Sequence, residues 1–91
     1  MLLLTKEIVL RNKVGLHARP AALFVKTANK FNSRITVICE EEESDGKSIT
    51  GILMLGAKQG VTIIVKAEGE DAQLAITELE KLLSDEEENY D

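Results

Sequence analysis

The chain reads Gly15-Leu16-His17-Ala18-Arg19-Pro20-Ala21 where its hydrophobic pattern changes from that of a strand to that of a helix. This segment holds the only histidine and the only proline of the 91 residues. Pro20 predicts the first turn of a helix, because the N–H that proline lacks would have no intrahelical partner there. The unpaired N–H groups at a helix start favour an anion. We therefore expect His17 to be a nucleophile beside a phosphate site, where the Arg19 guanidinium can hold phosphoryl oxygens. The alternative is a capping or surface histidine without chemistry.

The periodicity on either side of this segment predicts an α+β fold. Strands are expected over residues 5–12, 34–39 and 60–68, with a short additional strand after an acidic turn at 40–43. Helices are expected over residues 20–31, between Ser48 and Gly56, and after Asp71. The order is βαββαβα. Because the strands alternate, we expect an open-faced β-sandwich, in which three helices cover one face of a four-stranded antiparallel sheet.

The first predicted helix separates core residues from surface residues. Its buried stripe is expected to comprise Ala21, Phe24, Val25, Ala28 and Phe31. Ala22 and Leu23 are apolar but lie off that stripe, within a turn of His17, which favours a docking surface over core packing. The single cysteine, Cys39, is expected to face the core, and its lack of a disulfide partner fits a reducing cytosol.

The net charge of −5 conceals an uneven distribution. Five acidic residues follow Leu83, so we expect residues 1–84 to form one domain and 85–91 an acidic, disordered tail. Residues 1–38 contain seven basic residues and one acidic residue. No aromatic stacking residues are interleaved with them, because Phe24 and Phe31 belong to the predicted buried stripe, which argues against nucleic acid and favours an acidic protein partner. No apolar run approaches the length of about 20 residues that spans a membrane, so we expect no membrane insertion. The run Glu40–Glu43 is expected to be a solvated loop without metal-ligand geometry.

Together with Gly15–Ala21, a second motif gives a family resemblance over nearly the whole chain. It is Gly46-Lys47-Ser48-Ile49-Thr50-Gly51-Ile52-Leu53-Met54-Leu55-Gly56, and it is followed by Gln59-Gly60 and Ala67-Glu68-Gly69. The chain resembles the HPr family, the phosphocarriers of the bacterial phosphoenolpyruvate-dependent sugar phosphotransferase system. The resemblance implies a cytoplasmic phosphocarrier in which His17 accepts a phosphoryl group on Nδ1 from enzyme I and passes it to sugar-specific IIA domains. Arg19 would steady that group.

The resemblance also implies roles for the surrounding residues. Support of the phosphate loop falls to Gly15, Ala18 and Pro20. Ser48 lies where an ATP-dependent HPr kinase/phosphorylase acts in some relatives, so regulatory phosphorylation is one prediction and simple helix capping is the other. The expected docking residues are Leu16, Ala22, Leu23, Lys26, Ile49, Leu53 and Leu55. Two positions depart from the family pattern: Thr50 stands where relatives often have Met or Phe, and Glu40-Glu41 where they often have Asn-Gly.

Other functions remain open at this point. One is a specialised paralogue that serves a nitrogen-related branch or a dihydroxyacetone kinase. Another is a regulatory module that binds a transcriptional regulator, and a third is a small-ligand domain of similar architecture. His17 argues against a purely regulatory role, and the phosphate-ready loop argues against the small-ligand domain. We expect a monomer that needs no metal or cofactor.

Overall fold

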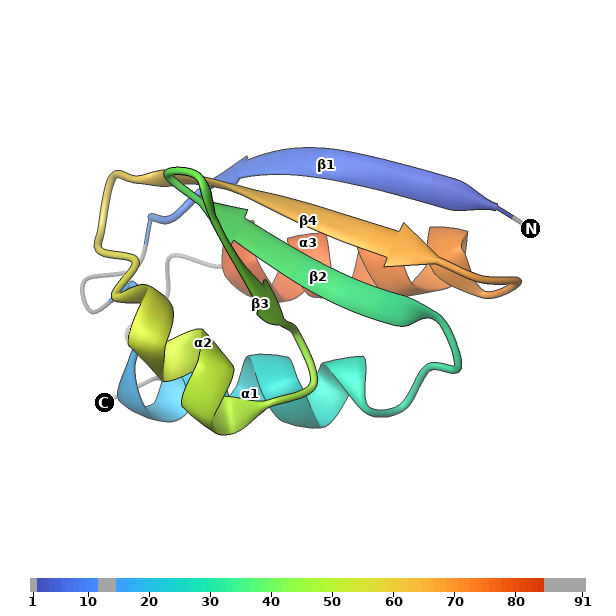
Figure 1. Ribbon diagram of the computed structural model, residues 1–91, viewed down its shortest axis with the longest axis horizontal. Helices are drawn as coiled ribbons and strands as arrows, with labels where there is room; N and C mark the ends of the chain where they lie inside the picture. Colours follow the sequence, from blue (N-terminus) through green and yellow to red (C-terminus); the bar gives the residue numbers. More distant parts are fainter. Residues whose placement is uncertain (1, 12–14, 85–91) are drawn as a thin grey trace.

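The computed structural model describes residues 2–11 and 15–84, which form a four-stranded antiparallel sheet and three helices (Figure 1). The elements are β1 (Leu3–Val9), α1 (Ala18–Ala28), β2 (Arg34–Cys39), β3 (Glu42–Asp45), α2 (Ile49–Leu55), β4 (Thr62–Glu68) and α3 (Ala72–Ser84). The strand order is β1-β4-β2-β3. α3 packs on β1 and β4, while α2 packs on β3 and α1. The predicted open-faced sandwich and its βαββαβα order are therefore confirmed.

The alternation of apolar residues along the strands produces the core. In β2, Ile35, Val37 and Cys39 are buried, and in β4, Ile63, Val65 and Ala67 are buried. These side chains face Phe24 of α1 and other apolar residues of the helices in one continuous cluster. The alternate positions of each strand form the open face of the sheet. Within the described residues, no helix is long and apolar enough to cross a membrane.

The helix α1 differs from its prediction at both ends. It begins two residues before Pro20 and ends at Ala28, three residues before the predicted Phe31. The N–H groups of Lys30 and Phe31 bond to carbonyls three residues back, so the chain leaves the helix through a tighter turn. Phe31 is still buried, as predicted, but it reaches the core from this turn.

The hairpin between β2 and β3 uses an unusual turn. Cys39 pairs with Glu42, so Glu40 and Glu41 form a two-residue loop, with φ angles of 50° and 77°. Such loops favour asparagine and glycine, because both central residues need positive φ. The predicted acidic turn is therefore shorter than expected, since Glu42 and Glu43 belong to β3. Burial and the charges of Glu40 and Glu42 raise the pKa of the Cys39 thiol.

The other β-strands differ from the sequence prediction only at their ends. β1 starts two residues early, and the final residue of its predicted range, residue 12, lies outside the described residues. β4 starts two residues late, at Thr62.

Side-chain hydrogen bonds connect the loops near the C-terminal end of α1. The Asp71 carboxylate accepts hydrogen bonds from the N–H groups of Asn32 (2.8 Å) and Ser33 (2.9 Å) and from the Ser33 hydroxyl. The Ser33 hydroxyl and the Asn32 N–H lower the pKa of Asp71. The Lys47 ammonium donates to the Phe31 carbonyl at 2.6 Å, which ties the segment before α2 to the end of α1. From the sequence, Asp71 is predicted only to precede the last helix.

Candidate phosphotransfer site

The loop before α1 is anchored to the segment that follows α2. The Leu16 N–H donates to the Ala57 carbonyl at 2.9 Å. Gly15 precedes this bond with a φ of 64°, and a Cβ at this position would collide with the Ala57 carbonyl and lie 2.8 Å from Cα of Lys58. Only glycine therefore satisfies both the left-handed backbone and the close approach. The positioning role predicted for Gly15 has a structural basis in this contact.

His17 is presented to solvent at the start of α1. It is the N-cap residue, with extended backbone angles (φ −143°, ψ 159°), and its side chain makes no capping hydrogen bond to the helix. The imidazole is therefore not used to hold the helix together. Ala18 then turns the chain sharply, with a φ of 51° that is unfavourable for any residue with a Cβ. Arg19 is exposed in the same first turn.

The neighbours of His17 divide into buried supports and exposed groups. Pro20 and Ala21 are buried and fix the first turn of α1 against the core. Leu16 is also fully buried, so the prediction that it is a docking residue is wrong. Its side chain faces inward because the Gly15 turn and the Leu16–Ala57 hydrogen bond direct it into the core. His17 thus lies between the buried Leu16 and the exposed Ala18 and Arg19.

The chain matches the family model described as "PTS HPr component phosphorylation site" over residues 4–85. It belongs to the HPr family. A phosphocarrier protein HPr from Mycoplasma capricolum is 40% identical over 77 residues, which are 85% of this chain and 86% of that protein. HPr from Bacillus anthracis has a similar structure, with a TM-score of 0.87, 37% identity, and coverage of 89% and 96% of the two chains.

A third relative shows the same fold at higher identity. HPr-C-His from Thermoanaerobacter tengcongensis is 48% identical with a TM-score of 0.83, and the match covers 92% of each chain. HPr from that organism is also known as a dimer. Membership of the family supports a role as a phosphocarrier of the phosphotransferase system.

The helix α2 lies beside this site, and Ser48 caps its start. The Ser48 hydroxyl accepts a hydrogen bond from the Gly51 N–H at 3.1 Å, which confirms the predicted cap. Gly56 ends the helix in the left-handed conformation, with a φ of 63°. Ala57, the anchor of the His17 loop, follows directly. The end of α2 and the start of α1 therefore lie at the same end of the molecule (Figure 1).

The predicted docking residues differ in how far they are exposed. Ala22 and Lys26 are exposed on α1, and Leu23 is half-buried there. On α2, Ile49 is 40% exposed, whereas Leu53 and Leu55 are half-buried against the core. Met54, which is 78% exposed, is not among the predicted docking residues. Helical periodicity could have found it, because Met54 lies two positions beyond the buried Ile52.

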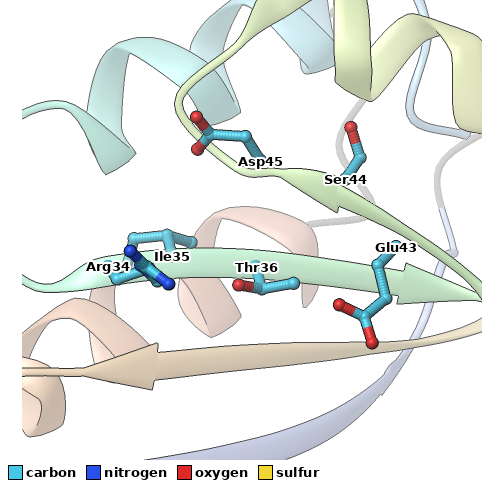
Figure 2. A pocket seen from close by; sticks show the side chains of 6 residues that line it. All are labelled: Arg34, Ile35, Thr36, Glu43, Ser44 and Asp45. Carbon is cyan, nitrogen blue, oxygen red and sulfur yellow. The ribbon is translucent and has the colours of Figure 1, made fainter.

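A pocket between β2 and β3 does not include the histidine. It is lined by Arg34, Ile35, Thr36, Glu43, Ser44 and Asp45 (Figure 2). Ser44 points toward α2, and Glu43 points the opposite way across β2 (Figure 2). Among the residues that the structure describes, no three histidine, cysteine or acidic side chains are arranged to hold a metal ion. His17 therefore lies on the exposed surface, outside this pocket.

Proposed function

We propose that this protein carries a phosphoryl group on His17 between a phosphoenolpyruvate-dependent enzyme I and the IIA domains of sugar permeases. The observation that carries the proposal is the exposed imidazole at the start of α1, on a loop fixed to Ala57. The family match supports the same role. Because phosphoryl transfer depends mainly on positioning and charge stabilisation, a shallow site that the partner protein completes is sufficient.

The proposed step needs only the groups present at this surface and the donor. An unprotonated imidazole nitrogen attacks the phosphorus of the donor's phosphoryl group and forms a bond to it. The bond between phosphorus and the donor breaks, and its electron pair remains on the donor. The family resemblance assigns this nitrogen as Nδ1. The first N–H groups of α1 and the Arg19 guanidinium stabilise the charge on the phosphoryl oxygens. In the second transfer, the acceptor attacks the phosphorus. The bond to the His17 nitrogen then breaks, and its electron pair returns to the imidazole.

The test is phosphorylation by purified enzyme I and phosphoenolpyruvate, followed by intact-protein mass spectrometry. We expect one phosphoryl group, which is lost in acid and retained in base, as for a phosphoramidate. His17→Ala should remain unmodified. Arg19→Ala should slow transfer and change the unfolding free energy by no more than about 0.5 kcal/mol, because Arg19 is exposed. An acid-stable product, or one that persists in His17→Ala, contradicts the proposal.

We propose further that a phosphate on Ser48 regulates this transfer. The Ser48 hydroxyl already accepts the Gly51 N–H, so a phosphate there can keep a similar bond and leave α2 folded. Its charge would repel an acidic partner surface. The test compares the enzymatically phosphorylated protein with the unmodified one. Unchanged melting with slower phosphorylation of His17 supports regulation, and an unchanged rate means that Ser48 is only a cap.

The proposal also covers the setting of the protein. We place the protein in the cytoplasm. We also propose that it is a monomer, because the surface around His17 must bind two protein partners in turn. Sedimentation of the full chain tests the monomer. The domain is proposed to end at residue 84, so truncation after that residue should leave the melting temperature unchanged. Service to a nitrogen-related or dihydroxyacetone-kinase branch is the second candidate, and transfer to acceptors of each branch distinguishes them.

A further inference from the structure

The connection between β1 and α1 begins and ends against one short segment, the segment that joins α2 to β4. Where the chain leaves β1, the Gly60 N–H donates to the Leu10 carbonyl at 2.8 Å. Where it reaches α1, the Leu16 N–H donates to the Ala57 carbonyl at 2.9 Å. Backbone hydrogen bonds to the same segment therefore fix the chain at both ends of the connection that leads to His17.

A glutamine side chain adds a further contact at the first of these ends. The Gln59 amide donates from Nε2 to the Arg11 carbonyl at 3.1 Å, across 48 positions of sequence. The backbone of this segment turns back on itself, because the Val61 N–H donates to the Lys58 carbonyl at 3.1 Å. Beyond the backbone bond to Leu10, the contact is therefore continued by a side-chain amide.

This bond restrains the main chain and adds little to the core. Gln59 is exposed, and its amide bonds to a backbone carbonyl. An exposed side chain contributes little packing, and a single hydrogen bond makes a modest net contribution to stability. A bond to the main chain does, however, restrict the direction in which the chain continues after Arg11. The effect of Gln59 therefore falls on the path of the chain toward His17 more than on the stability of the fold.

We infer that Gln59 is a positioning residue for phosphoryl transfer, because its bond to the Arg11 carbonyl helps to fix the chain that presents His17. Transfer requires the attacking nitrogen, the phosphorus and the leaving group to be roughly in line, and small displacements lower the rate strongly. Gln59 acts through the backbone and is assigned no contact with the phosphoryl group. The inference rests on the proposed function, since it names a residue that supports the same histidine.

The experiment mixes pre-phosphorylated enzyme I rapidly with increasing concentrations of Gln59→Met or of the unaltered protein. Methionine keeps an unbranched side chain of similar length and removes the hydrogen-bond donor. We expect the maximal transfer rate to fall about fivefold, because the histidine is held less precisely. The concentration that gives half of this rate should stay within about twofold, since no partner contact is removed. The melting temperature should fall by no more than about 4 °C.

A second readout needs no partner protein. His17 is the only histidine of the chain, so its imidazole C–H signals in a proton NMR spectrum are assigned directly. The matched control is Gln73→Met on α3, which removes another exposed glutamine, whose amide donates to the Thr77 hydroxyl at 3.3 Å. The imidazole signals should shift in Gln59→Met and stay in place in Gln73→Met, and the control should keep its maximal transfer rate.

The outcomes separate this inference from the function on which it rests. If the unaltered protein is phosphorylated on His17 and Gln59→Met keeps its maximal rate, the positioning role is wrong and the phosphocarrier role stands. If Gln59→Met changes only the half-maximal concentration, Gln59 contacts the partner instead, and the inference is overturned. An equal loss of rate in Gln73→Met overturns it as well. If the unaltered protein is not phosphorylated on His17, the proposed function fails and the inference fails with it.

Discussion

Two loops of this protein adopt left-handed backbone conformations, and they are held in different ways. The loop before α1 has positive φ at Gly15 and Ala18, and the hairpin between β2 and β3 has it at Glu40 and Glu41. The first loop is fixed by the Leu16–Ala57 hydrogen bond and by the close approach of Gly15 to Ala57 and Lys58. The hairpin is an exposed two-residue turn between paired strands. An unfavourable conformation therefore indicates function only where other parts of the fold impose it.

The largest effect is expected from Gly15→Ala, which breaks the first loop. The new Cβ meets the Ala57 carbonyl in a backbone region that alanine disfavours, so the loop must move. We expect a loss of at least about 2 kcal/mol in unfolding free energy, measured by urea denaturation. Phosphorylation of His17 should fall more than stability alone explains, when compared at a temperature where the variant is folded. A variant with normal stability and normal transfer would show that the anchor is dispensable.

A smaller effect of opposite sign is expected in the hairpin. Glu40→Asn combined with Glu41→Gly supplies the residues that positive φ favours and removes two of four consecutive acidic charges. The unfolding free energy should rise by about 1–2 kcal/mol. Transfer through His17 should be unchanged, because both residues are exposed in the turn of a separate hairpin. A change in transfer rate without a change in stability would show that the two loops are coupled.

The smallest effect concerns a third connection, which depends on pH. The pKa of Asp71 is lowered in the folded state, chiefly by the hydroxyl of Ser33 and then by the N–H of Asn32. A lowered folded pKa means that the stabilisation is present above the ordinary pKa of aspartate. It is lost as the pH falls below about 4 toward the folded value. Thermal melts between pH 7 and 2 should show a shallower acid limb for Asp71→Asn than for the unaltered protein. Parallel limbs would exclude this contribution.

The architecture and the candidate site could be predicted from the sequence to different extents. Alternation in β2 and β4 and the stripe of α3 predicted the core, because burial follows side-chain periodicity directly. His17, Arg19 and the Ser48 cap follow from local chemistry near helix starts. The inward direction of Leu16 could not be predicted, since it depends on Ala57, which lies 41 residues later in the chain. The Ser33–Asp71 bonds likewise join residues that only the tertiary fold brings together.

The order of the strands has a consequence for how the protein is made. Among the described strands β1 pairs only with β4, so that Leu3 lies opposite Glu68, 65 residues later in the chain. During synthesis the first strand must therefore wait until almost the whole domain has left the ribosome. Pairings this distant in sequence slow folding, because a long loop must close before contacts repay it. The anchor of the His17 loop, Ala57, also lies 40 residues after the histidine, so a nascent chain cannot fix this loop before residue 57 has emerged.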